Sequence, residues 1–432
     1  MKMIRTDGRW FFLLTALLAL TVAAEYAAFR MLRVPVLLAV LLCAALLTLS
    51  ALRRSRMAAA VVLLFAAQGM ALLCVRHSAV MLAVTVSAVC AAALLVFFRR
   101  QRRLAGRPAR LRTAVCLAAG LVFLTLTVTA FVPDLFSRAV QGNVMGRTAE
   151  ESVQTRADGV TAYRNLPYPS DAPNSTMDVF VSPQGRGTVV YIHGGGFVMG
   201  DKDTAGQNAY LNAWLDAGYH VVAVNYALAP QYRYPTAIRQ CAAALCRLGE
   251  TADRFGLDCD RLLLVGDSAG GQLAGQLALI QSDPAYAAKL GVSPADVTVR
   301  GYISICGLVD PPRFSDTGFL FADWAHHQWG ASYFGTADFE ASGAANEASI
   351  LLQAGPGFPP SFLSDGNFAT FDRQNADLAD RLESLGVAVT RDFVPRSEAR
   401  LAHVYQLAVD TDPYAKASFE RQLAFAGQAV SS

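Results

Sequence analysis

Apolar residues are distributed unevenly along this chain. The first third holds long, almost unbroken apolar runs, near residues 10–29, 34–52, 57–75, 78–98 and 113–131. Each run is about long enough to cross a ~30 Å hydrocarbon core as a helix, and a single cleaved signal peptide would not repeat in this way. The pattern predicts a transmembrane region of about five helices over residues 1–136.

Basic residues between the runs predict their orientation. Arginine and lysine are retained on the cytoplasmic side of a membrane. They are concentrated before the first run, after the second and after the fourth, whereas the other loops hold only Arg30, Arg33 and Arg76. We therefore expect a cytoplasmic N-terminus, with everything after Phe131 outside the cytoplasm. The arginine cluster lies between two runs, so it favours this topology over a nucleic-acid patch, and no nucleic-acid partner is expected.

Composition narrows the role of the apolar third. The 432 residues are 53% hydrophobic, and their mean hydropathy of +0.32 is too high for one soluble domain. The formal net charge of +3 mostly reflects the arginine bias. Glu25 and Gln68 are the only strongly polar side chains inside the runs. Because ion and proton pathways need buried ionisable groups, the pattern favours an anchor over a transporter.

Beyond this region, short apolar runs alternate with helix-like stretches. Residues 137–158 are polar and are expected to form a linker or a short cap helix. The expected strands are 160–168, 177–181, 188–192, 220–225, 262–265, 299–306, 360–364 and 387–394, and the clearest helices are 236–255, 272–280 and 372–385. Such alternation predicts an α/β domain over residues 159–432, with a mostly parallel sheet and helices on both faces.

A candidate nucleophile lies at a turn between an expected strand and helix. The strand 262–265 runs directly into Gly266-Asp267-Ser268-Ala269-Gly270. A serine between glycines at such a turn is the G-x-S-x-G nucleophile elbow. Any side chain at either glycine would collide with neighbouring backbone, and the serine would stand exposed at the start of a helix, whose amides face developing negative charge. The simpler alternative is a glycine-rich turn with a capping serine.

A second glycine motif favours the catalytic interpretation. The expected strand 188–192 continues into His193-Gly194-Gly195-Gly196-Phe197. Consecutive glycines let backbone amides approach a substrate oxygen. The amides of Gly194, Gly195 and Ala269 are predicted to form an oxyanion hole, in which each donor typically contributes ~3 kcal/mol.

Together with Gly200-Asp-Lys-Asp-Thr204, Tyr226-Ala-Leu-Ala-Pro230 and Tyr234-Pro235, these motifs resemble the hormone-sensitive-lipase-like family of α/β-hydrolases, which includes bacterial esterases. The resemblance covers about residues 160–425 and implies an α/β-hydrolase fold. Ala227 and Gln231 stand where the family usually has arginine and glutamate. In this family's layout the aromatic-rich segment 314–334 would be a cap or pocket wall, with ordinary surface packing as the alternative.

The base must follow the serine, because a hydroxyl is a poor nucleophile until an imidazole takes its proton. In α/β-hydrolases the order is serine, acid, histidine. His326 and His327 come too early, within the expected cap, and are interpreted as a surface feature rather than a ligand pair. The resemblance places the catalytic histidine at His403, after the last strand; the alternative is a polar loop histidine.

The acid position departs from the pattern of the family. Related enzymes have aspartate in a Gly-x-x-Asp-Pro-Leu segment, but here the corresponding stretch 366–371 has Ala369 at that place. Asp365, at the end of the preceding strand, is predicted to orient His403, whereas Asp372 is expected to open the next helix as its N-terminal cap. Asp365 could instead merely cap the Gly-Asn turn, and the enzyme could also work as a serine–histidine dyad.

These residues predict a membrane-anchored serine carboxylesterase that hydrolyses a short-chain acyl ester outside the cytoplasm through an acyl-serine intermediate. One alternative is transfer of the acyl group to a cell-surface glycan or lipid, and another is a catalytically silent binding module. No cofactor is expected. No cysteine–histidine spacing suggests zinc, so no metal is expected either.

Overall fold

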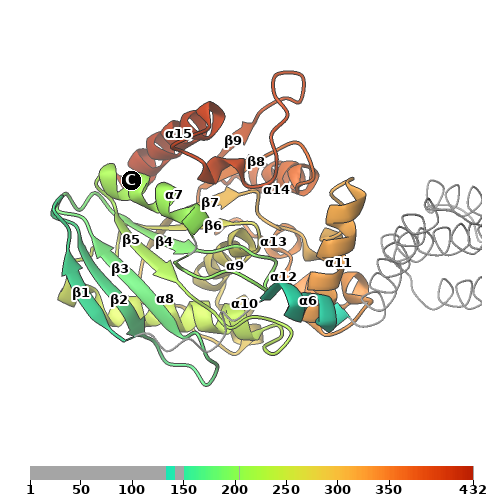
Figure 1. Ribbon diagram of the computed structural model, residues 1–432, viewed down its shortest axis with the longest axis horizontal. Coiled ribbons are helices and arrows are strands. Elements are labelled where there is room, and N and C mark those ends of the chain that lie inside the picture. Colours follow the sequence, from blue (N-terminus) through green and yellow to red (C-terminus); the bar gives the residue numbers. More distant parts are fainter. Residues whose placement is uncertain (1–132, 142–149, 204, 432) are drawn as a thin grey trace, which may run out of the picture. The chain divides into compact units, whose positions relative to one another are not determined.

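The computed structural model describes residues 133–141, 150–203 and 205–431 (Figure 1). Asp134–Ser432 form one compact unit, separate from the residues that precede them. The five predicted membrane helices fall outside the described residues. Among the helices that are described, none has both the length and the apolar character needed to cross a bilayer.

A nine-stranded sheet, in the order β1-β2-β3-β5-β4-β6-β7-β8-β9, forms the centre of this unit. Its strands are β1 Ser152–Thr155, β2 Thr161–Pro167, β3 Thr176–Val181, β4 Thr188–Ile192, β5 His220–Val224, β6 Leu262–Asp267, β7 Val299–Ile305, β8 Ser361–Asp365 and β9 Val389–Phe393. Pairing is antiparallel from β1 to β5 and parallel from β5 to β9. The predicted mostly parallel α/β sheet is confirmed.

Helices cover both faces of this sheet (Figure 1). One apolar layer contains residues of α8 Thr236–Phe255, α9 Ala269–Ser282, α10 Pro284–Leu290 and α14 Asp372–Ser384. The other contains residues of α7 Ala205–Asp216 and α15 Pro413–Ala429. Because both faces are covered, every residue of the central strands β4 and β6 is buried. The carboxyl ends of these strands then carry the candidate site.

The remaining helices lie beyond that edge or connect strands. They are α6 Pro133–Gln141, α11 Leu320–Phe334, α12 Gly343–Ala348 and α13 Ile350–Gln353. The helix α6 packs against α11, where Ser137 donates to Ser332 with 2.7 Å between the hydroxyl oxygens. The predicted linker or cap helix at 137–158 therefore contains the end of a helix, but it also contains β1. The sheet thus begins at Ser152, before the expected start at residue 159.

The motif Gly200-Asp-Lys-Asp-Thr204, which follows the triple glycine, has a structural role in this fold. The Lys202 ammonium lies 3.0 Å from the Asp178 carboxylate on β3, and both side chains are buried. The backbone amide of Lys202 donates to the Asn225 side chain at 2.8 Å, just beyond β5. Removing one partner of a buried ion pair leaves the other charge uncompensated. The motif therefore fixes the loop that follows β4 against its neighbouring strands.

Candidate active site

Ser268 occupies the sharp turn between β6 and α9, with φ 51° and ψ −118°. A side chain at Gly266 would place its Cβ 2.3 Å from the carbonyl oxygen of Gly270. One at Gly270 would lie 2.0 Å from the carbonyl oxygen of Ile192, at the end of β4. Only glycine fits at either position. The turn therefore has the geometry of a nucleophile elbow, including the strained backbone at the serine.

The triple-glycine loop lies beside this elbow because β4 and β6 are parallel neighbours, with Ile192 opposite Gly266. In the described part of the chain, no acceptor takes the backbone amide of Gly195, Gly196 or Ala269. Gly195 and Gly196 have φ values of 109° and 59°, in the region that favours glycine. These three amides are available to stabilise an oxyanion.

The prediction that Gly194 contributes to the oxyanion hole is wrong. Its amide already donates to the Asp267 carboxylate at 2.8 Å, and a Cβ on Gly194 would lie 2.2 Å from the other carboxylate oxygen. This glycine is needed for close packing rather than for substrate. Gly196 supplies the free amide in its place. The sequence offered no signal to choose between adjacent glycines.

Asp267 links the elbow to the triple-glycine loop, a role that the sequence did not indicate. It lies in the variable position of the elbow motif, and its carboxylate accepts from the Tyr191 hydroxyl at 2.5 Å as well as from Gly194. Burial raises the pKa of Asp267 to about 6, although both hydrogen bonds oppose that rise. The carboxylate thus holds the ends of β4 and β6 in one arrangement.

His403 lies where a general base could act on the serine. It lies on the loop between β9 and α15, and its Nε2 is 2.9 Å from the Ser268 hydroxyl oxygen. Burial lowers the pKa of His403 to about 4, so the ring is neutral at physiological pH and can accept a proton. The structure brings together the predicted serine and histidine.

The acid reaches His403 indirectly. Asp365 ends β8 and is fully buried, but its Oδ1 contacts the Thr370 hydroxyl, whose oxygen lies 2.9 Å from Nδ1 of His403. The Asn375 amide donates to Asp365 Oδ2 at 2.8 Å. Asp372 is the first residue of α14, but Phe371 occupies the N-terminal cap position, so the predicted capping role of Asp372 is wrong. The predicted carboxylate therefore lies near His403 but not against it, and nothing in the sequence indicated the hydroxyl between the carboxylate and the imidazole.

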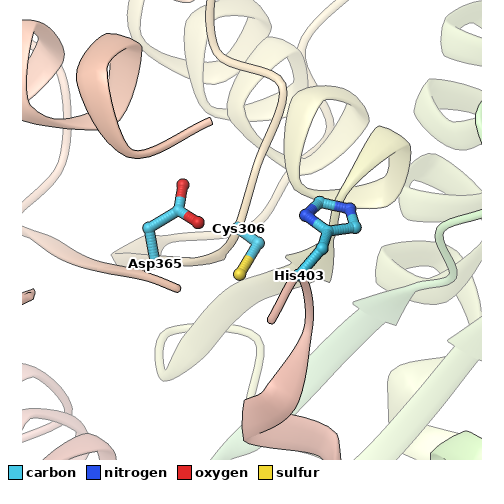
Figure 2. A group of neighbouring side chains, drawn as sticks. All are labelled: Cys306, Asp365 and His403. Carbon is cyan, nitrogen blue, oxygen red and sulfur yellow. The ribbon is translucent and has the colours of Figure 1, made fainter. Parts of the chain in front are cut away.

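A cysteine lies beside this acid, as Figure 2 shows. Possible ligand atoms of Cys306, Asp365 and His403 lie within 4.8 Å of one another. However, the Thr370 hydroxyl already bonds both the carboxylate and the imidazole, and the cysteine sulfur accepts from the Val404 amide at 3.2 Å. Burial also raises the pKa of the Cys306 thiol well above its usual value. The group fits a hydrogen-bond network better than a metal site.

The helix α11 covers the site. The ring of His326 is 6.3 Å from that of His403, and a Cβ on Gly196 would lie 2.6 Å from the ring of Trp329. The segment is therefore a cap rather than ordinary surface. The expected surface location of His326 and His327 is wrong, because both are buried. Their rings contact aromatic neighbours on the inner side of the cap: Phe314, at 5.0 Å from His326, and Phe339, at 5.6 Å from His327.

Sequence comparisons agree with this architecture. Residues 189–399 match a family described as alpha/beta hydrolase fold. A stretch of 90 residues is 47% identical to an ethyl acetate hydrolase of Pseudomonas putida, and one of 92 residues is 38% identical to an acetyl esterase of Salmonella paratyphi B. Each match covers 21% of this chain and 28% of the relative. The chain thus matches about a quarter of the length of these curated relatives.

A structural comparison extends over more of the chain. Esterase B from Lactobacillus rhamnosis, in a crystal structure with a bound inhibitor, superposes with a TM-score of 0.55 at 22% identity. The superposition covers 70% of this chain and 94% of the other. Similarity at this level of identity establishes the fold. The described sheet, elbow and cap therefore form an α/β-hydrolase fold.

Proposed function

We propose that this chain is a serine carboxylesterase. The observation that carries the proposal is the 2.9 Å contact between His403 Nε2 and the Ser268 hydroxyl, at an elbow that faces free amides. A neutral imidazole in hydrogen-bond reach of a serine is the arrangement that activates the hydroxyl. A silent binding module would not need this contact, a strained serine and an oxyanion loop in one place.

The reaction follows from the geometry. The Ser268 oxygen attacks the ester carbonyl carbon while its proton passes to His403 Nε2. The carbonyl oxygen becomes negatively charged and accepts from the amides of Gly195, Gly196 and Ala269. His403 then gives its proton to the departing alcohol as the carbon–oxygen bond breaks. A water molecule, deprotonated by the same imidazole, attacks the acyl-serine and releases the acid.

We propose a short-chain acyl ester as the substrate. Support comes from the relatives named as an ethyl acetate hydrolase and an acetyl esterase. The cap also places large rings close to the catalytic loops, with Trp329 against Gly196 and His326 facing His403. Rigid rings beside the triple-glycine loop and His403 are expected to limit the room for a long acyl chain.

The experiment measures hydrolysis of nitrophenyl esters with acyl chains of graded length by the full chain in detergent. We expect the highest kcat/KM for the shortest esters and none above background for Ser268→Ala. Turnover that rises toward long chains would overturn the substrate class, and near-normal turnover by Ser268→Ala would overturn the enzyme assignment. Adding an alcohol acceptor tests for acyl transfer: an ester product formed in preference to the free acid would replace hydrolysis by transfer.

We also propose that the N-terminal region anchors the enzyme in a membrane, with the hydrolase domain outside the cytoplasm. The five apolar runs and the arginine distribution support this. Protease is added to intact cells or, if the cells have an outer membrane, to spheroplasts from which it has been removed. The protease should degrade the domain without permeabilisation of the inner membrane. A domain that is degraded only after the membrane is permeabilised would reverse the topology.

A further inference from the structure

This chain has no carboxylate at the position where related enzymes have their catalytic acid. Ala369 stands there, with φ 53°, and its methyl group cannot accept a hydrogen bond. The next residue, Thr370, is buried and turns its hydroxyl toward both Asp365 and His403. A hydroxyl has one proton to donate and can accept in return. The order of donation along this chain of atoms therefore decides which nitrogen of His403 carries the proton.

The surroundings of Asp365 fix that order. Its Oδ2 accepts from Asn375, whose amide group also donates to the carbonyl oxygen of Gly307 at 2.8 Å. An ionised carboxylate can only accept, so the Thr370 hydroxyl donates to Oδ1. The Thr370 oxygen must then accept from Nδ1 of His403. This leaves the lone pair of Nε2 toward Ser268, which is the tautomer that a general base requires.

We propose that Thr370 is the positioning residue through which Asp365 orients His403, so that the array runs Ser268, His403, Thr370, Asp365. This inference rests on the proposed esterase function. It makes the hydroxyl, rather than direct contact with a carboxylate, the partner of the imidazole.

The relay has a consequence that direct pairing lacks. When Asp365 is protonated, the Asn375 amide excludes the proton from Oδ2, so it lies on Oδ1 and donates to Thr370. The threonine hydroxyl then donates to Nδ1, and the proton of His403 moves to Nε2, where it blocks the acceptance of the Ser268 proton. Ionisation of Asp365 thus sets the direction of donation along the relay.

This consequence predicts a specific pH profile. Burial raises the pKa of Asp365 to about 7, and Asp372 on α14 adds to the rise. Other titratable groups near the relay are the Cys306 thiol, whose pKa is raised, and His326, whose pKa burial lowers to about 3. Activity should therefore decline as pH falls through about 7, well above the pKa of His403 at about 4. Protonation of His403 should affect only the activity that remains below pH 7.

The test compares Thr370→Val with Thr370→Ser in the full chain. Valine keeps the shape and removes the hydroxyl, so we expect kcat to fall about 100-fold with KM within about threefold. The decline near pH 7 should disappear from the residual activity. Serine keeps the hydroxyl and should retain kcat within about tenfold, together with the decline near pH 7.

A third variant places a carboxylate at the position where related enzymes have it. Ala369→Asp introduces a residue that tolerates the local left-handed backbone. In the Thr370→Val background it should restore kcat about tenfold and move the acid limb toward higher pH than in Thr370→Val alone, because an adjacent carboxylate favours the charged imidazole.

Near-normal kcat in Thr370→Val, or equal loss in the serine and valine variants, would overturn the relay. Stoichiometric labelling of Ser268 by a fluorophosphonate in each variant shows that the site is folded. Failure of the proposed function is distinguishable, because it would appear as activity that survives Ser268→Ala, whatever the threonine variants do.

Discussion

The two ends of the catalytic array are built differently. At the serine end, backbone sterics determine the geometry, since Gly266 and Gly270 leave no room for a Cβ and the turn can adopt one shape. At the acid end, side-chain hydrogen bonds determine it, through Asp365, Thr370 and Asn375. Adding atoms at the serine end should therefore disrupt its geometry. At the acid end, exchanging a hydrogen-bond donor for an acceptor should disrupt the orientation of His403.

The largest loss of activity is expected where the two ends meet, at His403. His403→Ala removes the base and should lower kcat by about 10⁴-fold or more. If Ser268 and His403 act as one unit, as proposed, the double variant with Ser268→Ala should be hardly worse than either single variant. Steady-state kinetics with a nitrophenyl ester measures this. Additive losses in the double variant would show that the two residues act independently.

Asp365→Asn tests the acid end by changing polarity without changing size. The new asparagine has two orientations. In one, its NH₂ group points at the NH₂ group of Asn375, so that two donors face each other; in the other, its NH₂ group donates to Thr370, which reverses the direction of donation toward His403. We expect kcat to fall about 1,000-fold, as for a histidine held in the wrong tautomer.

Asp372→Asn is the matched control, because it makes the same chemical change at the first residue of α14. It should leave kcat within about threefold, since no described hydrogen bond joins Asp372 to His403. If Asp372→Asn lost most of its activity and Asp365→Asn kept it, Asp372 would be the acid. If both variants kept near-normal kcat, the enzyme would work as a serine–histidine dyad.

Gly270→Ala tests the serine end by adding one carbon. The new Cβ would lie 2.0 Å from a backbone oxygen of β4, so we expect the free energy of unfolding to fall by about 3 kcal/mol or more. Gly343→Ala, on α12 with open space around its Cα, should change it by less than about 1 kcal/mol. Thermal unfolding of the two variants gives the comparison. Equal melting temperatures would contradict the steric argument.

Apart from the control variants, the smallest effect is expected for Asp267→Asn. Asp267 belongs to the serine end but acts through hydrogen bonds. Asp267→Asn retains an oxygen that can accept from Tyr191 and Gly194. We therefore expect kcat/KM to stay within about fivefold, whereas Asp267→Leu, which has no acceptor, should lose much more. If the asparagine variant lost as much as leucine, the carboxylate charge itself would be required.

The same difference explains what the sequence could predict. Strand and helix alternation predicted the sheet and helices such as α8, because covered strands are continuously apolar. The elbow was legible because a steric requirement restricts a position to glycine. Ser268 was predicted from its motif. His403 and the cap were predicted from the family resemblance, which left ordinary surface packing open for the cap.

Hydrogen bonds between side chains are harder to predict from the sequence than steric requirements for glycine. Thr370 was missed because a threonine near a turn has many ordinary roles, and Asp365 was reached only through the absence of an acid at Ala369. The choice between Gly194 and Gly196 depended on a contact from Asp267, 73 positions away along the chain. The burial of His326 and His327 likewise depends on packing of α11 that no local pattern records.

The proposed nucleophile of this esterase is Ser268, activated by His403. The most direct test of that role treats the full chain with a fluorophosphonate, follows esterase activity and maps the covalent adduct by peptide mass spectrometry. We expect one adduct per chain, on Ser268, formed in proportion to the loss of activity and greatly slowed in His403→Ala. Complete inhibition with the adduct on another residue, or full activity with Ser268 quantitatively modified, would exclude Ser268 as the nucleophile.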